Sequence, residues 1–155
     1  LNIIHGDQKP TSGHISFAGQ ILSREEITSI SSYILQSSHY FDDLSLTDNI
    51  TLGSVIDQTR LDKILRQTGL EDLKHRTLSN DSLSGGEKQR IEIARALYHN
   101  SQLILADEIK ANLDLENSRK ISDLLFSMPQ TVIEVIHHYT EEDLKRYDQV
   151  IRLTK

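Results

Sequence analysis

Cysteine is absent from this sequence of 155 residues, so neither disulfide bonds nor thiolate metal sites can form within it. No apolar run approaches the roughly 18 to 20 residues that a membrane-spanning helix needs. Positive charge is scarce as well, because 17 Lys and Arg residues stand against 23 Asp and Glu residues, for a formal net charge of −6. A general nucleic-acid binder normally carries a basic face. We therefore expect no nucleic-acid partner, and any phosphate contact must come from local backbone geometry.

Short apolar strands and amphipathic helices alternate along the chain, which predicts an α/β fold in a single domain. Strands are predicted over residues 14–17, 32–36, 103–106, 131–136 and 148–153. The segment between the second and third of these is mostly helical, with apolar spacing that favours a helix within residues 57–73 and a break at Gly69. The sequence thus predicts a core part over 1–44, a helical insertion over 45–98 and a second core part over 99–155.

The stretch Leu83-Ser84-Gly85-Gly86-Glu87-Lys88-Gln89-Arg90 opens one of the predicted helices. Ser84 with Glu87 three residues later is a capping box, which places the helix start at the two glycines. The first turn of a helix offers backbone N–H groups and a favourable dipole to an anion such as phosphate. The alternative is a helix start that contains glycine and binds nothing.

Polar side chains follow three of the predicted strands. Gln36 ends one strand, Asp107 and Glu108 end the next, and His137 follows the third. Ligands of α/β sheets bind at the carboxyl ends of the strands, so these side chains are candidate site residues. Each has a structural alternative: a loop hydrogen bond for Gln36, an acidic turn for the two carboxylates, and a structural hydrogen bond for His137. Asp114 is placed to cap the helix that follows.

Taken in this order, the motifs resemble those of the ATP-binding domains of ABC (ATP-binding cassette) transporters. Gln36 matches the Q-loop of that family, residues 45–98 its helical subdomain, and Ser84-Gly85-Gly86 its signature motif. The carboxylate pair then matches Walker B, Asp114 the D-loop and His137 the H-loop. The resemblance implies a P-loop NTPase-like fold, in which a mostly parallel sheet is flanked by helices and a helical subdomain is inserted.

The resemblance also implies roles for the strand-end residues, with ATP and Mg²⁺ as cofactors. Asp107 would hold Mg²⁺ through water, and Gln36 would help to place the metal and the attacking water. Glu108 would polarise that water as general base, and His137 would contact the γ-phosphate. His138 is adjacent to the H-loop position, but the spacing from the strand favours His137. Phosphoryl transfer mainly needs such positioning, a metal and charge compensation.

Partners follow from the same resemblance. Ser84, Gly85 and Gly86, with Asp114, would bind the ATP that lies on a second ABC ATPase domain in a head-to-tail dimer. The domain would act with the transmembrane domain of the transporter, in the same or a separate chain, at the cytoplasmic face of the cell membrane. Tyr40-Phe41-Asp42, Asn49 to Gly53 and Glu134 are more similar to exporters than to importers.

One part of the family pattern is missing. The phosphate-binding sequence Gly-x-x-x-x-Gly-Lys-Ser/Thr does not occur, and the stretch from Gly6 to Gly13 does not replace it because no Lys-Ser/Thr follows the glycine. Leu1-Asn2-Ile3-Ile4 resembles the end of the helix that follows the P-loop, so we expect the sequence to begin just after that loop and to be inactive alone. Two alternatives are a shortened, non-hydrolysing partner that donates its signature motif in trans, and a soluble ABC ATPase without a transport role.

Overall fold

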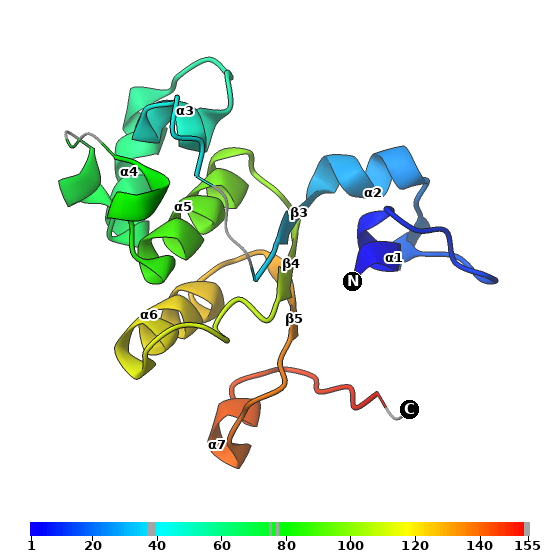
Figure 1. The fold of residues 1–155 in the computed structure, drawn as a ribbon. Coiled ribbons are helices and arrows are strands. Elements are labelled where there is room, and N and C mark those ends of the chain that lie inside the picture. Colours follow the sequence, from blue (N-terminus) through cyan, green and yellow to red (C-terminus); the bar gives the residue numbers. More distant parts are fainter. Residues whose placement is uncertain (37–39, 75, 77, 154–155) are drawn as a thin grey trace.

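The computed structural model describes residues 1–36, 40–74, 76 and 78–153. Its centre is a parallel sheet of β3 (Ser31–Ile34), β4 (Leu103–Asp107) and β5 (Thr131–Val135), in the order β3-β4-β5 (Figure 1). A separate antiparallel hairpin is formed by β1 (Ser16–Phe17) and β2 (Gln20–Ile21). The predicted α/β class with a parallel sheet is confirmed.

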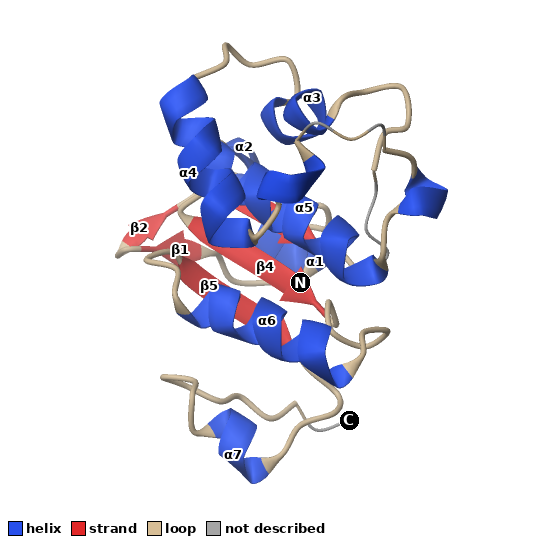
Figure 2. Cartoon of the chain, turned by 90° about the vertical axis from the view of Figure 1, so that its left-hand side faces the viewer, coloured by secondary structure: helices blue, strands red, loops and turns tan. Residues whose placement is uncertain are grey.

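Helices cover both faces of this sheet. Figures 1 and 2 show α5 and α6 on one side and α1 and α2 on the other. The helices of the described residues are α1 (Asn2–His5), α2 (Arg24–Ile30), α3 (Leu46–Thr51), α4 (Gln58–Thr68), α5 (Gly85–Tyr98), α6 (Leu115–Phe126) and α7 (Glu141–Leu144), with short 3₁₀ turns at Glu71–Leu73 and Asn80–Ser82.

The central strand β4 is apolar at four consecutive positions because both of its faces are buried, as expected for a parallel sheet. Ile104 and Ala106 pack with residues of α5 and α6, whereas Leu103 and Leu105 pack on the side of α1, α2 and the hairpin. The alternation of a strand therefore divides one apolar run between two hydrophobic clusters. The carboxyl end of β4 is held rigidly between them.

A third hydrophobic cluster lies within the helical part of the chain and joins α3, α4 and α5. The helix α5 belongs to two clusters, since Ile91 and Ala94 face α3 and α4 while Ile93 and Ala96 face the sheet. The signature helix is thus fixed to the core and to the helical part at once. Within the described residues, no helix combines the length and apolar character that crossing a membrane requires.

Most predicted elements are confirmed, including the end of α4 at Gly69 in a left-handed backbone conformation. The strand predicted over residues 148–153 is wrong, because this segment has no strand and pairs with none of the described strands. Its apolar side chains are open to solvent, with Val150 45%, Ile151 73% and Leu153 93% exposed. An alternating pattern predicts a strand only where a neighbouring strand can receive it.

Candidate functional site

The three parallel strands end at one edge of the sheet. Ile34 pairs with Ala106, and Asp107 pairs with Val135, so the residues that follow β3, β4 and β5 emerge side by side. Gln36, Asp107 and Glu108 line one open cleft at this edge, together with Leu35 and Asn112. Side chains that are distant in the sequence are therefore brought together where a ligand of an α/β sheet is expected.

Glu108 is joined directly to His137. The Oε1 atom of Glu108 lies 2.8 Å from Nε2 of His137. The backbone of Glu108 is in the left-handed region, with φ of 50°, which costs a residue with a Cβ on the order of 1–2 kcal/mol. Two hydrogen bonds hold this turn. The Glu108 N–H donates to the carbonyl of Val135 at 3.1 Å, and the Ala111 N–H donates to the carbonyl of Glu108 at 3.0 Å. The strained turn aims the carboxylate at the imidazole.

Asp107 is held by Tyr33, a residue that the sequence analysis missed. The Tyr33 hydroxyl donates to Oδ2 of Asp107 at 2.8 Å and also lies 2.9 Å from Oδ1 of Asn2. Burial and the neighbouring Asp107 carboxylate raise the pKa of the Tyr33 phenol to about 12. This contact depends on the pairing of β3 with β4, which the sequence pattern does not reveal.

The residues of the cleft fit a magnesium ion bound to phosphate. Mg²⁺ prefers oxygen ligands and is usually held by one or two carboxylates together with substrate phosphates. The side chains of Asp107, Glu108 and Gln36 offer carboxylate and amide oxygens in one cleft. Across the part of the chain that the structure describes, no three His, Asp or Glu side chains converge on one metal position, so a full protein cage for a metal is not formed there.

The signature turn has the predicted capping box at the start of α5. The Ser84 side chain accepts from the N–H of Glu87 at 3.2 Å, and the Glu87 carboxylate accepts from the backbone N–H of Ser84 at 2.7 Å. Partial burial raises the pKa of Glu87, but the hydrogen bonds from Ser84 outweigh it, and the net shift is downward. The helix start is therefore fixed where the sequence predicts it.

The two glycines of the signature motif pack against the start of α6. A Cβ on Gly86 would lie 2.7 Å from Oδ1 of Asn117, and one on Gly85 would lie 3.2 Å from a methyl of Leu113. Asp114 caps α6 as predicted, accepting from the N–H of Asn117 at 2.9 Å. The signature turn and the Asp114 cap thus lie together, and the residues that line the cleft of Gln36 are a different set.

The fold is similar to that of solved ABC ATPase structures. CbiO1 of Clostridium perfringens, described as part of the ABC transporter complex cbiONQ, superimposes with a TM-score of 0.74 at 23% sequence identity. The match covers 88% of this chain and 61% of that protein. The sheet, its flanking helices and the helical part therefore have the fold of an ABC ATPase domain.

The chain belongs to the ABC transporter family, whose sequence model matches residues 1–111. The spermidine/putrescine import ATP-binding protein PotA of Mycoplasma mycoides is 35% identical over 162 aligned positions, which cover 97% of this chain and 46% of PotA. The lipoprotein-releasing system ATP-binding protein LolD of Buchnera aphidicola is 35% identical over 83% of this chain and 61% of LolD. The chain spans about half the length of relatives such as PotA. The family match includes Gln36, Asp107 and Glu108 but ends before Asp114 and His137.

Proposed function

We propose that these residues form the hydrolytic part of an ABC transporter ATP-binding domain, which couples ATP hydrolysis to membrane transport. The observation that carries this proposal is the contact of 2.8 Å between the Glu108 carboxylate and the His137 imidazole, at the edge of the cleft that Gln36 and Asp107 also line. Transfer of a phosphoryl group to water needs a base for the water and oxygen ligands for a metal ion. The Glu108 carboxylate beside the His137 imidazole supplies the base, and the oxygens of Asp107 and Gln36 supply the ligands.

Each side chain has a role in that reaction. Glu108 accepts a proton from the attacking water, and His137 orients Glu108 and contacts the γ-phosphate. Asp107, held by Tyr33, and Gln36 would hold the Mg²⁺ of MgATP. When bound, this ion neutralises charge on the phosphate oxygens. Tyr33 is thus a positioning residue for Asp107.

The signature motif acts on a second nucleotide. Ser84, Gly85 and Gly86 lie at the start of α5, beside the α6 start that Asp114 caps, and are not among the residues that line the cleft. We propose that they bind the γ-phosphate of an ATP held by another ATPase domain in a head-to-tail dimer. The first-turn N–H groups of α5 and its dipole suit such an anion.

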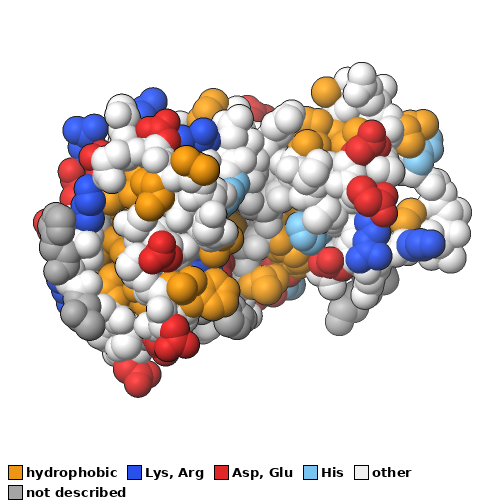
Figure 3. Space-filling model, turned by 90° about the horizontal axis from the view of Figure 1, so that it is seen from above, with side chains coloured by type: hydrophobic (Ala, Val, Ile, Leu, Met, Phe, Trp, Pro, Cys, Tyr) orange, Lys and Arg blue, Asp and Glu red, His pale blue; other side chains and the backbone are white. Residues whose placement is uncertain are grey.

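A membrane partner is supported by the surface of the helical part. Exposed apolar side chains lie on the segments that flank α3, and Figure 3 shows apolar side chains gathered over this end of the molecule. They are Phe41, Leu44, Leu52, Val55 and Ile56. Exposed apolar patches mark interaction sites. We propose that the transmembrane domain docks here, at the cytoplasmic face of the membrane. The direction of transport stays a prediction, since the relatives include import and lipoprotein-releasing proteins.

Nucleotide binding in this family needs a phosphate-binding loop, and the 155 residues do not contain its sequence pattern. No Gly-x-x-x-x-Gly-Lys-Ser/Thr loop occurs among them, and the amides and lysine of that loop make most phosphate contacts in such enzymes. We therefore expect no appreciable MgATP binding by the 155 residues alone. Calorimetry checks this by titrating MgATP into the 155-residue chain; a dissociation constant in the micromolar range contradicts the proposal.

A second candidate is a non-hydrolysing partner that only donates its signature motif in trans, since the signature turn at the start of α5 is not among the residues that line the cleft. Two variants of the full-length complex separate the two functions. If the chain hydrolyses ATP, Glu108→Gln abolishes hydrolysis in its own cleft. If the chain only donates its signature motif to another domain, Glu108→Gln leaves hydrolysis unchanged. Ser84→Arg blocks hydrolysis in both cases, because it fills the signature turn.

A further inference from the structure

Glu134 is a buried carboxylate that the proposed reaction does not use. It lies in β5 opposite Ala106, and its side chain is only 1% exposed. A buried carboxylate is costly unless it is paired. A carboxylate at this position therefore needs a function that an apolar side chain could not serve.

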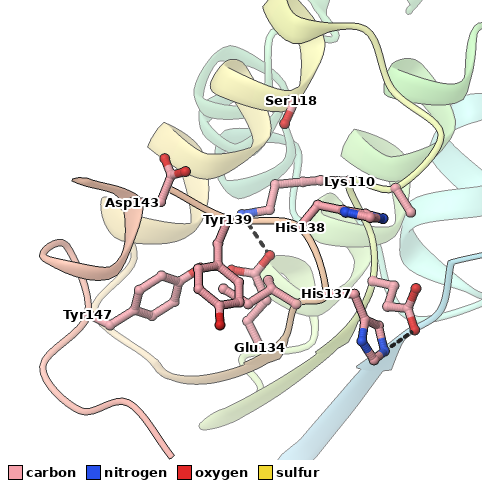
Figure 4. Close-up of a pocket in the computed structure, with 11 residues that line it drawn as sticks. Lys110, Ser118, Glu134, His137, His138, Tyr139, Asp143 and Tyr147 are labelled. Atoms are coloured by element: carbon pink, nitrogen blue, oxygen red, sulfur yellow. Dashed lines mark hydrogen bonds and ion pairs between the residues drawn. The ribbon is translucent and has the colours of Figure 1, made fainter. Parts of the chain in front are cut away.

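Two partners contact the Glu134 carboxylate from different segments. The Lys110 ammonium lies 2.9 Å from its Oε1 atom, and the Tyr147 hydroxyl donates to its Oε2 atom (Figure 4). Lys110 also donates to the hydroxyl of Ser122 in α6 at 3.1 Å. Burial and the hydrogen bond to Glu134 raise the pKa of the Tyr147 phenol above its usual range. The phenol therefore stays a hydrogen-bond donor at neutral pH.

The positions of these residues in the chain connect the network to the hydrolytic pair. Lys110 lies two residues after Glu108, in the turn whose backbone is left-handed at Glu108. Glu134 lies three residues before His137, in the strand whose carbonyl at Val135 receives the N–H of Glu108. Lys110, Glu134 and Tyr147 line the same pocket as Glu108 and His137 (Figure 4). The network thus joins the segment that carries the carboxylate to the segment that carries the imidazole.

Tyr147 brings the C-terminal segment into this arrangement. Its ring packs edge-on against Phe126 of α6, with ring centroids 4.9 Å apart. The guanidinium of Arg146 lies 4.2 Å from the Phe126 ring centroid and makes an ion pair of 2.7 Å with Asp123. The segment after α7 is therefore fixed on α6, and its phenol is fixed on Glu134.

We propose that Lys110, Glu134 and Tyr147 form a positioning network that sets the geometry between Glu108 and His137. It rests on the proposed function, since those two residues form the hydrolytic pair there. The three residues of the network touch neither water nor phosphate in that reaction. They act through the turn at Glu108 and the end of β5. Misplacement of a reacting group by about 1 Å can lower a rate on the order of a hundredfold, so a network of this kind affects turnover rather than nucleotide affinity.

The test uses Tyr147→Phe and Glu134→Gln in the full-length protein, with Tyr139→Phe as the matched control. Tyr139 lines the same pocket but is 46% exposed and takes no part in the contacts between Lys110, Glu134 and Tyr147. We expect kcat for ATP hydrolysis to fall by roughly tenfold or more in both network variants, with KM within about twofold of the parent value and kcat of Tyr139→Phe unchanged. Melting curves verify that Tyr147→Phe, which loses one hydroxyl, is folded.

A second readout does not depend on activity. The imidazole nitrogen resonances of His137 report its contact with Glu108, and we expect them to shift in the two network variants but not in Tyr139→Phe. Unchanged His137 resonances with unchanged kcat overturn the network while the proposed function stands. If the parent protein does not hydrolyse ATP, the proposed function fails, and the His137 resonances alone then decide whether the network sets this geometry.

Discussion

The side-chain amide of Gln89 donates to the backbone carbonyl of Gln36 at 3.2 Å, and so connects helix α5 to the cleft that Gln36 lines. The same nitrogen lies 3.2 Å from the carbonyl of Leu35, and Gln89 is almost completely buried. One side chain of α5 thus contacts the backbone beside the cleft, while the signature turn lies at the start of the same helix.

Replacing Gln89 tests this connection. Gln89→Leu keeps the apolar stem but leaves two backbone carbonyls without their donor, so we expect a loss of about 1–2 kcal/mol in the free energy of unfolding. Urea titration measures it. Gln8→Leu, at an exposed loop position, serves as control and stays within about 0.5 kcal/mol of the parent. Equal stability of the two variants would show that the Gln89 contacts contribute nothing.

Gly86 is predicted to tolerate no side chain, although alanine favours helices. Gly86→Ala places a Cβ 2.7 Å from Oδ1 of Asn117, whose side chain is itself fixed by a hydrogen bond of 2.7 Å to Asp114. We expect the clash to outweigh the gain in helix propensity of about 1 kcal/mol, and thus a net fall in melting temperature. Gly85→Ala meets only a methyl of Leu113 and is the milder control. A higher melting temperature for Gly86→Ala contradicts the packing described above.

The Asp114 cap predicts a dependence of stability on acid pH. The backbone N–H and the side chain of Asn117 lower the pKa of the Asp114 carboxyl below its ordinary value of 3.8. A carboxyl whose pKa is lowered by folding stabilises the protein above its unfolded-state pKa, and this stabilisation is lost as the pH falls through the lower, folded-state value. The free energy of unfolding of Asp114→Asn should therefore depend less on pH below about pH 4 than that of the parent. Asp43→Asn, in an exposed turn, is the control. If the free energy of unfolding depends on pH in the same way in the parent and in Asp114→Asn, the role of the cap is refuted.

The strand β5 is an edge of the described sheet, and its backbone predicts association between copies. Unpaired edges recruit other strands unless a charge blocks them. Ile133, which is 36% exposed on β5, offers a position for such a charge. We expect light scattering of the 155-residue chain to rise with concentration, and Ile133→Lys to reduce it. A monomer that persists at high concentration in the parent chain speaks against an open edge.

The polar residues that follow the strands were predictable from the sequence. A short apolar run that ends in a polar residue indicates the end of a strand, even when the neighbouring strands are unknown. This gave Gln36, Asp107, Glu108 and His137, and the capping box gave the start of α5. Tyr33 and Gln89 were not predictable, since each acts across a contact between segments more than 50 residues apart.

The Lys110–Glu134–Tyr147 network escaped the sequence analysis for the same reason, because its members belong to a turn, a strand and the segment after a short helix. The strand predicted over residues 148–153 failed in the opposite way. Alternation alone favoured it, but no described strand pairs with it. Local patterns thus locate chemistry at the ends of elements, and only the fold shows which elements meet.

The hydrolytic role of Glu108 is the central claim, and ATP hydrolysis by the full-length protein carrying Glu108→Gln tests it most directly. The amide keeps the shape of the side chain and a contact with His137 but cannot accept a proton from water. We predict that hydrolysis falls by about a hundredfold or more, the usual contribution of a general base, while MgATP binding is retained. Hydrolysis at the parent rate in Glu108→Gln would contradict the assignment of this edge of the sheet as the hydrolytic site.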